Sequence, residues 1–444
     1  MRALKVVVFL SFMGLVASLN LNRGHHNANA VKSDAVDMSF LSTTTGATTF
    51  DPSFVTTTST TPPVFSSAAP LTTTTFSDPV STFTPGVAER ECGCTHSKIW
   101  LDIVAVIDNS QTMTQEGIST IQATLDTVVH ELTLNVTGGW ASRVGVITFN
   151  EKATVVADLK TYTSTTDFEN QLFTITASTT IQGVNILSGL QAALGLIKDA
   201  NPGPNRRSVV ILFSSAYNNG GYDDPLPMAH QMVSDNIKLI TVAFVQRMES
   251  SEVLLLSELA YPGFNLTNDQ TDLIDAMYDS LCQANCFCPG NWMQFRTNYN
   301  DITSRGYGIC LYYAGISSGW QPAKLACHGE ATGAYLTTEF SKEKHDFNVA
   351  YIKDVSQNGE YDYHIGLSYL NGGYVWEQAN GQTVPLNNGY SNWNLHFPNN
   401  AQGNCVLNTN IVGSIIGWTN EDCWSKTKRY LCQVNTCDTD YYCS

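Results

Sequence analysis

Oxygen-bearing side chains follow the first strand-like apolar run of the sequence, residues 99–107. Asp108, Ser110 and Thr112 come directly after this run and are spaced two residues apart. Alternating carboxylate and hydroxyl oxygens at the end of a strand can bind a hard cation such as Mg²⁺. An Asp and a Ser at this place can instead cap the helix that follows. The sequence leaves both interpretations open.

The elements that must position these side chains alternate between strands and helices. Strand-like apolar runs occupy residues 99–107, 144–149, 209–213 and 239–245, and helix-length stretches occupy residues 112–132, 186–197, 227–236, 252–260 and 269–282. β-Branched strands that alternate with helices indicate a parallel sheet covered on both faces. We therefore predict a doubly wound α/β domain, in which ligands sit beyond the carboxyl ends of the strands.

This predicted domain resembles the von Willebrand factor A domain over its whole length. The metal site of that family reads Asp-x-Ser-x-Ser, with a Thr from a second loop and an Asp after the fourth strand. Asp108 and Ser110 match this pattern, and Thr112 supplies the equivalent hydroxyl. Val184 stands where the Thr is expected, and Ser215 where the Asp is expected. The resemblance therefore implies a site for Mg²⁺ or Ca²⁺ that has lost one carboxylate and binds weakly.

The composition changes after residue 285, where Gly, Asn, Trp and Tyr become frequent and apolar runs become short. Two helices are expected, near residues 323–328 and 342–351, among short strands and long loops. Cysteines recur through this part of the chain. We therefore predict a second domain of the α+β class that is stapled by disulfides.

The segment 288–432 resembles the C-type lectin-like fold. Its landmarks are residues 320–327, 334–336, 364–367 and 390–393, together with Phe347 and Trp418. The resemblance implies three disulfides, which join Cys288 to Cys310, Cys327 to Cys432 and Cys405 to Cys423. The sequence does not decide the pairing of the other six cysteines, which are Cys92, Cys94, Cys282, Cys286, Cys437 and Cys443. Disulfides are expected there, with zinc binding by clustered thiols as the alternative.

The calcium ligands of this lectin family are replaced in the sequence. Sugar-binding members hold Ca²⁺ with Glu-Pro-Asn in a long loop and with Asn-Asp after a Trp. Here the first motif reads Phe397, Pro398 and Asn399, and the second reads Thr419 and Asn420. Both carboxylates are missing, so the resemblance implies a very weak Ca²⁺ site. We expect no firmly bound cofactor in either domain.

The same loop can bind a ligand without a metal ion. Phe397 is expected to face solvent, and an aromatic ring beside amide groups suits a sugar ring or a protein surface. Trp376 and Trp393 occupy positions that the family usually buries, and we expect both in the core.

The first 18 residues predict export from the cell. Arg2 and Lys5 precede a short apolar run, and small residues at 16–18 form a cleavage site. The run is too short to cross a bilayer, and no later stretch approaches the roughly 18 apolar residues of a membrane helix. We predict a secreted, extracellular protein without membrane insertion, whose twelve cysteines are mostly oxidised.

Residues 19–90 are rich in Ser, Thr and Pro and are expected to form a disordered stalk, either O-glycosylated or a plain linker. Asn135 and Asn265 each begin an Asn-x-Thr acceptor for N-glycosylation. Acidic side chains outnumber basic ones by 39 to 23, which gives a net charge of −16. This balance argues against nucleic acid or an anionic membrane as a partner.

The predicted order is a signal peptide over residues 1–18, the stalk over 19–90, the A-type domain over 91–285 and the lectin-like domain over 286–444. This order resembles the secreted C-type lectin-like proteins of nematodes, which implies binding of glycans or microbial surfaces in innate immune defence. The alternative is an extracellular adhesion or matrix component that binds proteins through the A-type domain. We find no support for an enzyme, because the histidines are scattered and no Gly-rich phosphate loop follows a strand.

Overall fold

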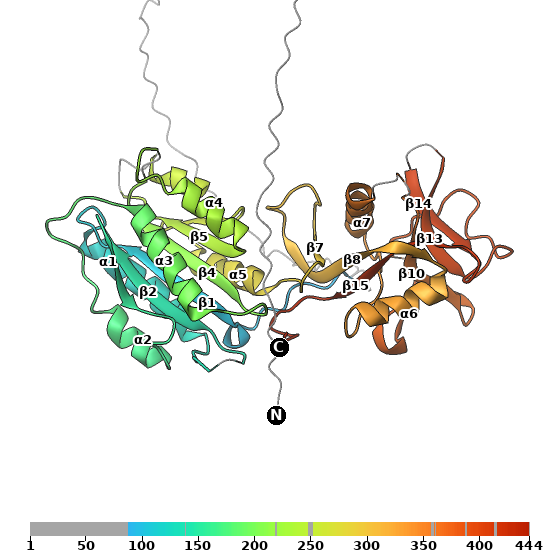
Figure 1. Cartoon of the computed structure of the whole chain (residues 1–444), viewed down its shortest axis with the longest axis horizontal. Helices are drawn as coiled ribbons and strands as arrows, with labels where there is room; N and C mark the ends of the chain where they lie inside the picture. The colour runs from blue at the N-terminus through green and yellow to red at the C-terminus, as the bar shows by residue number, and fades with distance from the viewer. Residues whose placement is uncertain are drawn as a thin grey trace, which may run out of the picture. The chain divides into compact units, whose positions relative to one another are not determined.

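A computed structural model describes residues 88–443, apart from residues 138, 218–219, 247–251, 357–358, 360, 387–388 and 413–414 (Figure 1). The predicted signal peptide and all but the last residues of the predicted stalk lie outside the described residues. Among the helices of the described part, none has the length and apolar character needed to cross a membrane.

The first domain is built on a six-stranded sheet in the order β3-β2-β1-β4-β5-β6. Its strands are β1 (Leu101–Asp108), β2 (Arg143–Phe149), β3 (Ala153–Ala157), β4 (Arg207–Ser214), β5 (Ile237–Ala243) and β6 (Asn265–Thr267). All neighbouring strands run parallel except the edge pair β2 and β3, which is antiparallel. Every residue of β1 is buried, as expected for a central strand that is covered on both faces.

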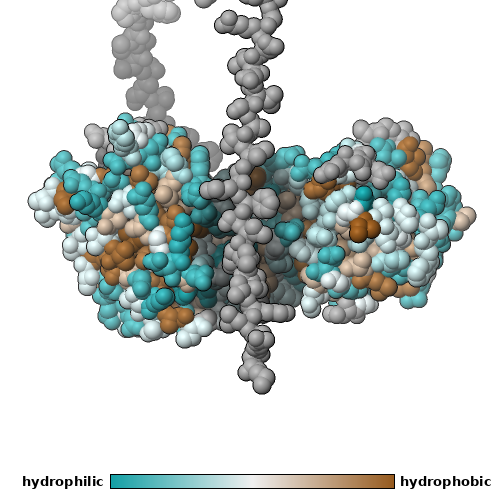
Figure 2. Space-filling view, viewed as in Figure 1, coloured by the Kyte–Doolittle hydropathy of each residue, from teal (hydrophilic) through white to brown (hydrophobic). Residues whose placement is uncertain are grey.

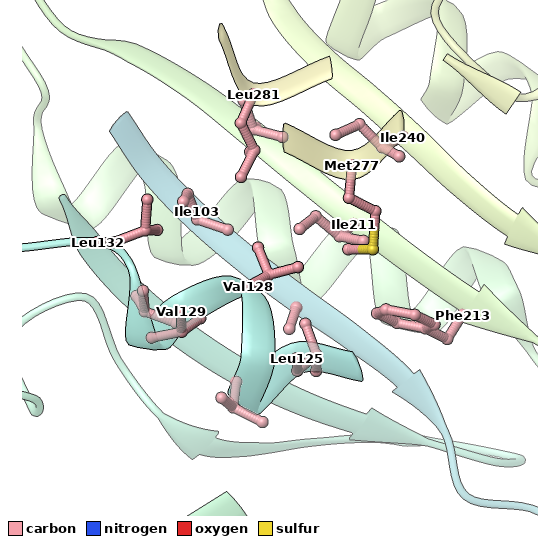
Figure 3. Close-up of a cluster of buried hydrophobic side chains, with 14 of the residues drawn as sticks. Ile103, Leu125, Val128, Val129, Leu132, Ile211, Phe213, Ile240, Met277 and Leu281 are labelled. Carbon is pink, nitrogen blue, oxygen red and sulfur yellow. The ribbon is translucent and has the colours of Figure 1, made fainter. Parts of the chain in front are cut away.

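Helices cover both faces of this sheet, namely α1 (Thr114–His130), α2 (Thr165–Leu172), α3 (Ile186–Ala200), α4 (Leu226–Ser234) and α5 (Leu273–Asn285). On one face, Leu125 and Val128 of α1 and Met277 of α5 pack over Ile103 and Ile211 of the sheet (Figure 3). These five side chains are at most 2% exposed. Helices α3 and α4 form a second core on the opposite face. The predicted doubly wound α/β fold is therefore confirmed.

Several details of the first domain differ from the sequence prediction, among them the short strand β6, which was not expected. Strand β3 was not expected, because it lies at the edge and only one of its five residues is buried. Helix α2 was not expected either, and its eight residues begin at a Ser164 cap that accepts a hydrogen bond from the main-chain N–H of Asp167. The helix predicted over 252–260 is wrong. That stretch forms a short 3₁₀ helix, η2 (Val253–Glu258), because its buried residues Val253 and Leu256 follow the three-residue repeat of a 3₁₀ turn.

The second domain contains a nine-stranded sheet in which β15 is central. Its strands are β7 (Met293–Arg296), β8 (Gly306–Ser318), β9 (Tyr335–Leu336), β10 (Tyr363–Leu370), β11 (Gly373–Glu377), β12 (Thr383–Pro385), β13 (Cys405–Val412), β14 (Ile415–Glu421) and β15 (Lys428–Asn435). Strand β15 pairs with β8, β9 and β10, and β13 joins β14 to this sheet. The helices of this domain are α6 (Trp320–Glu330) and α7 (Lys342–Val355), and a short 3₁₀ turn, η3 (Ala379–Gly381), follows β11. Another short 3₁₀ turn, η1 (His96–Lys98), precedes β1 of the first domain. Both predicted helices of this domain are present, and both are longer than expected.

Six disulfides join all twelve cysteines. Three of them are the pairs that the lectin-like resemblance implies, Cys288–Cys310, Cys327–Cys432 and Cys405–Cys423. The other three are Cys92–Cys286, Cys94–Cys282 and Cys437–Cys443. Cys94 and Cys282 lie close to His96, but their sulfurs are bonded to each other and so are not available as thiolate ligands for zinc.

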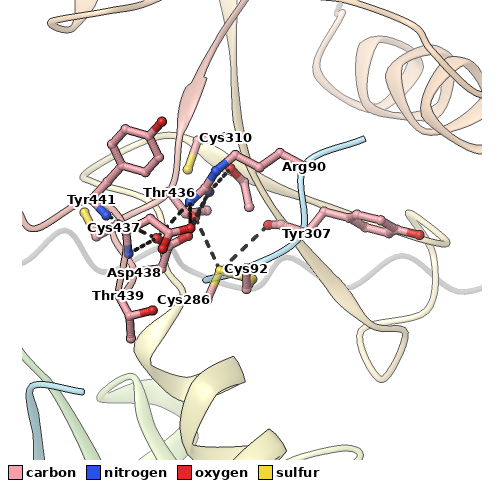
Figure 4. A network of polar contacts seen from close by, with 12 residues as sticks. Arg90, Cys92, Cys286, Tyr307, Cys310, Thr436, Cys437, Asp438, Thr439 and Tyr441 are labelled. Carbon is pink, nitrogen blue, oxygen red and sulfur yellow. Dashed lines mark hydrogen bonds and ion pairs between the residues drawn. A yellow bond between two sulfur atoms is a disulfide. The ribbon is translucent and has the colours of Figure 1, made fainter. Parts of the chain in front are cut away.

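The segment before the first domain is held against the residues that follow β15 (Figure 4). Both terminal nitrogens of Arg90 contact the two carboxylate oxygens of Asp438, at 2.7 and 2.9 Å. Thr436 donates a further hydrogen bond to Asp438. Burial tends to raise the pKa of Asp438, but the Arg90 guanidinium and these hydrogen bonds hold it below its usual value. This bidentate pair therefore stays ionised and fixes the segment in place.

A second ion pair, fully enclosed, lies beside the first. The Lys344 ammonium is 3.7 Å from a carboxylate oxygen of Glu89 and donates to the side-chain oxygen of Gln433 at 3.3 Å. The other Glu89 oxygen accepts a hydrogen bond from the main-chain N–H of Phe340. Burial lowers the pKa of Lys344 and raises that of Glu89, and the opposite charge of each partner offsets part of both shifts. Each buried charge is therefore compensated by its partner, and removal of either group would leave the other buried without a counter-charge.

Candidate functional site

Asp108 lies at the carboxyl end of β1, as the sequence predicts, and its side chain is fully buried. One carboxylate oxygen, Oδ1, accepts a hydrogen bond from the main-chain N–H of Ser110 at 2.9 Å. The other, Oδ2, accepts from the N–H of Ser215 at 2.9 Å and from its hydroxyl at 2.6 Å. Strand β4 runs parallel to β1 and brings Ser215 to this place. Hydrogen bonds from the protein therefore satisfy both oxygens of the single carboxylate.

Three hydroxyl groups, those of Ser110, Thr112 and Ser215, lie beside the Asp108 carboxylate. The Thr112 hydroxyl oxygen lies 2.6 Å from that of Ser110 and 3.1 Å from that of Ser215. The sequence-predicted residues Asp108, Ser110 and Thr112 are thus brought together, with Ser215 as a fourth member. This set offers one negative charge, and its oxygens bond to one another. It is a poor fit to a divalent cation, which depends on carboxylate charge.

The second loop of the predicted metal site supports a helix instead of supplying a ligand. The Asn185 side chain caps α3 by accepting a hydrogen bond from the N–H of Ser188 at 2.8 Å, and it donates to Asp223 at 3.2 Å. Val184 packs against the adjoining core. These residues line a cavity of about 520 Å³ at the carboxyl edge of the sheet, beside the fully exposed ring of Tyr222.

In the second domain, Asn420 joins the long loop to β14. Its side-chain oxygen accepts a hydrogen bond from the main-chain N–H of Asn399 at 2.7 Å. Its side-chain nitrogen donates to the carbonyl oxygens of Asn399 and Gly403, at 2.8 and 2.6 Å. Asn420 is fully buried, so its amide holds the loop and does not face solvent. We call these three contacts the amide clasp.

The other predicted loop residues divide between surface and interior. Thr419 is 1% exposed, and its hydroxyl has no hydrogen-bond partner among the described residues. Phe397 is half-buried, and Asn399 is exposed on the same loop. Leu395, two residues before Phe397, is 79% exposed. Phe397 and Asn399 therefore lie toward the surface of the loop, whereas Thr419 and Asn420 are buried and Asn420 bonds to the loop main chain.

One of the two tryptophans of this region lies in the core, as the sequence predicts, and the other is partly buried. Trp376 is 1% exposed, and Trp393 packs against the same buried cluster. Both rings are close to Trp418, with ring centroids 5.4 and 5.6 Å away in edge-on arrangements. These rings set the position of the loop that carries Phe397.

Sequence reasoning missed Glu339, the centre of a polar network beneath the loop. This fully buried carboxylate accepts hydrogen bonds from five side chains, which are His345, Asn348, Tyr363, Asn408 and Trp418. Burial alone raises the pKa of a carboxyl group, but the neighbouring His345 and the hydrogen bonds lower that of Glu339 to about 2. No motif marked this residue, because its partners come from four separate segments of the chain.

His345 connects this network to the long loop. Its Nδ1 lies 2.9 Å from Glu339, and its Nε2 lies 3.0 Å from the side-chain nitrogen of Asn392. With Asn392 as the donor, Nδ1–H donates to Glu339. Burial favours the neutral ring, yet the Glu339 carboxylate raises the pKa of His345. Asn392 also donates to the carbonyl of Ile416, so one chain of hydrogen bonds runs from Glu339 to β14.

Two family models match the chain, and together they cover both domains. Residues 102–276 match the von Willebrand factor type A domain, and residues 316–434 match the lectin C-type domain. The chain is 31% identical over 371 residues to C-type lectin domain-containing protein 160 of Caenorhabditis elegans, covering 80% of this chain and 56% of that protein. It is 33% identical over 156 residues to the low affinity immunoglobulin epsilon Fc receptor of Mus musculus, covering 34% and 38%.

Among solved structures, proximal thread matrix protein 1 from the mussel byssus is similar with a TM-score of 0.36 and 18% identity, over 44% of this chain and 49% of that one. The chain spans about half the length of the Caenorhabditis elegans relative and less of the mouse one. The domain matches agree with the two folds described above. The chain therefore contains a von Willebrand factor type A domain followed by a C-type lectin domain.

Proposed function

We propose that this chain is a secreted binding protein whose C-type lectin domain recognises carbohydrate on microbial surfaces, largely without a metal ion, in innate immune defence. Both of its domains belong to families of binding domains. The observation that carries the proposal is the amide clasp. Asn420 holds the long loop with its own amide, and on that loop Asn399 is exposed and Phe397 is partly exposed.

The character of the surface supports recognition by a few side chains. On the face drawn in Figure 2, apolar side chains lie in small groups among hydrophilic ones. An aromatic ring beside an exposed amide can stack on a sugar ring and bond to its hydroxyl groups. Phe397 and Asn399 provide this pair on one loop.

The test is binding of the full disulfide-bonded chain to a panel of immobilised glycans, with Ca²⁺ and with a chelator. Binding should be equal in both conditions. Phe397→Ala should weaken it by about fivefold, because a stacked ring contributes on the order of 1 kcal/mol. Leu395→Ala is the matched control, since Leu395 is an exposed apolar side chain on the same loop. Loss of binding in the chelator, or equal binding by Phe397→Ala, would contradict the proposal.

A second candidate is protein binding through the A-type domain, as in an extracellular adhesion or matrix component. It is favoured by the cavity of about 520 Å³ at the carboxyl edge of the first sheet and by the exposed Tyr222 beside it. Under this alternative, Tyr222→Ala should weaken binding to extracellular matrix proteins, and Phe397→Ala should leave it unchanged.

We also infer that the two Asn-x-Thr acceptors carry N-linked sugars, as suits a secreted protein. Asn135 is partly exposed, and its side-chain oxygen accepts hydrogen bonds from the N–H and the hydroxyl of Thr137. Asn265 is exposed on β6. A shift in mass after enzymatic removal of N-glycans, lost in the Asn135→Gln and Asn265→Gln variants, tests this.

A further inference from the structure

A small cavity between β5, α5 and the β7–β8 hairpin is lined by positive side chains. Its volume is about 190 Å³. Hydrogen bonds between Gln283 of α5 and the main chain of Gly306 close one side, and the ion pair of Arg305 with Asp279 closes another. Lys238 of β5 and Arg296 of β7 reach the cavity from opposite elements. The disulfide Cys92–Cys286 holds the neighbouring backbone together.

Lys238 is surrounded by groups that cannot neutralise it. Its ammonium lies 3.2 Å from the ring centroid of Tyr261 and 5.7 Å from that of Phe264. Burial, together with the charges of Arg296 and Arg207, lowers the pKa of Lys238 to about 7. Arg207 itself lies over an aromatic ring and donates to a main-chain carbonyl. The Lys238 ammonium group is therefore partly deprotonated at neutral pH.

Arg296 is also without a counter-charge. Its Nε is a buried donor with no hydrogen-bond partner. Among the described residues, neither Arg296 nor Lys238 forms an ion pair, and the one carboxylate that lines the cavity, Asp279, is paired with Arg305. The chain carries 39 acidic side chains, so this lack of carboxylates does not come from a shortage of acids. Enclosed cations without a partner destabilise a fold unless something else neutralises them.

We propose that this cavity binds a small oxyanion, a sulfate or phosphate group that is either free or carried as an ester on a larger molecule. The Arg296 guanidinium supplies planar paired donors that suit tetrahedral oxyanions, and the Lys238 ammonium supplies a point charge. The volume suits one such group. This site is separate from the lectin loop, and it does not depend on glycan binding there.

Titration calorimetry of the full chain with inorganic sulfate, at constant ionic strength, tests the proposal. We expect one saturable site per chain. Affinity should be at least about tenfold higher at pH 6 than at pH 9, because Lys238 loses its charge between these two values. The titratable and charged groups that face it or line the cavity with it are Tyr261, Arg207, Arg296, Arg305 and Asp279. A monosaccharide sulfate that competes with inorganic sulfate would assign the ester form, and one that does not would assign the free anion.

Two variants and a control make the test decisive. Arg296→Gln should weaken sulfate binding by about tenfold or more, since it removes a charged donor pair. Lys238→Met should abolish the pH dependence, and without sulfate it should raise the unfolding midpoint because it removes a repelled cation. Lys353→Gln, an exposed lysine on α7, should bind like the unchanged chain. Absence of saturable binding at pH 6, or sulfate affinity that is unchanged in a folded Lys238→Met variant, would overturn the proposal.

Discussion

Asp108 and Ser215 are joined by two hydrogen bonds, although 107 residues separate them in the chain. The parallel pairing of β1 with β4 brings them together. A carboxylate at position 215 would share a bound cation with the Asp108 carboxylate. The serine instead donates both its N–H and its hydroxyl to Asp108, so the protein itself compensates the buried charge.

Replacing Ser215 by Asp should place a second carboxylate next to Asp108, and the two negative charges should repel each other. Without metal, their repulsion should lower the free energy of unfolding by about 1–3 kcal/mol, because a donor is lost as well. Added Mg²⁺ should restore much of this stability in the variant and change the unmodified chain little. Thermal unfolding with and without Mg²⁺ measures both effects, with Ser119→Asp, exposed on α1, as the control. A midpoint of the unmodified chain that rises clearly with Mg²⁺ would refute this expectation.

The amide clasp should make a measurable contribution to stability. Asn420→Ala removes one acceptor and two donors and leaves the main chain of the loop unpaired, so a loss of about 1–3 kcal/mol is expected in urea unfolding. Asn400→Ala, on the exposed part of the same loop, should be close to neutral. If both variants were equally stable, the clasp would have no role in holding the loop.

Glu339 should make stability depend on pH in a defined direction. Its folded pKa of about 2 lies below the ordinary 4.5, so its contribution is present above pH 4.5 and is lost as pH falls toward 2. Glu339→Gln should cost about 3–5 kcal/mol at pH 7, since it leaves His345 and the other donors without a charge to bond. Urea unfolding should show this difference shrinking below pH 4.5. Glu343→Gln, exposed on α7, is the control, and a difference that stayed constant down to pH 2 would exclude this role.

The two disulfides at the ends of the first domain should act redundantly. Cys92–Cys286 and Cys94–Cys282 span 194 and 188 residues, and each still closes the loop when the other is absent. Replacing one pair by Ala should cost about 1–2 kcal/mol, whereas replacing both should cost about 4–5 kcal/mol. Replacing Cys437 and Cys443, only six residues apart, should cost less than the double removal. Additive losses in chemical unfolding would argue against a shared loop.

The four central strands of the first domain, most of the helices and the residues at the end of β1 could be predicted from the sequence, because apolar runs and their alternation follow from burial. The edge strands β3 and β6 could not, because they are short and mostly not buried. The compensation of Asp108 by Ser215 could not, because it depends on how two distant segments meet. Glu339 and Trp418 are 79 residues apart, and neither carries a signal of its own. The inward hydrogen bonds of Asn420 to Asn399 and Gly403 depend on the path of the loop, which composition does not encode.

The disulfide between Cys92 and Cys286 gives the protein a defined mechanical path. A pull applied between residue 88 and residue 443 passes from Cys92 through sulfur to Cys286 and then along the second domain. The 193 residues between these two cysteines lie off that path as a covalently closed loop. The six-stranded sheet of the first domain thus lies outside the covalent path of the tension, and its carboxyl edge keeps its shape while the chain is stretched.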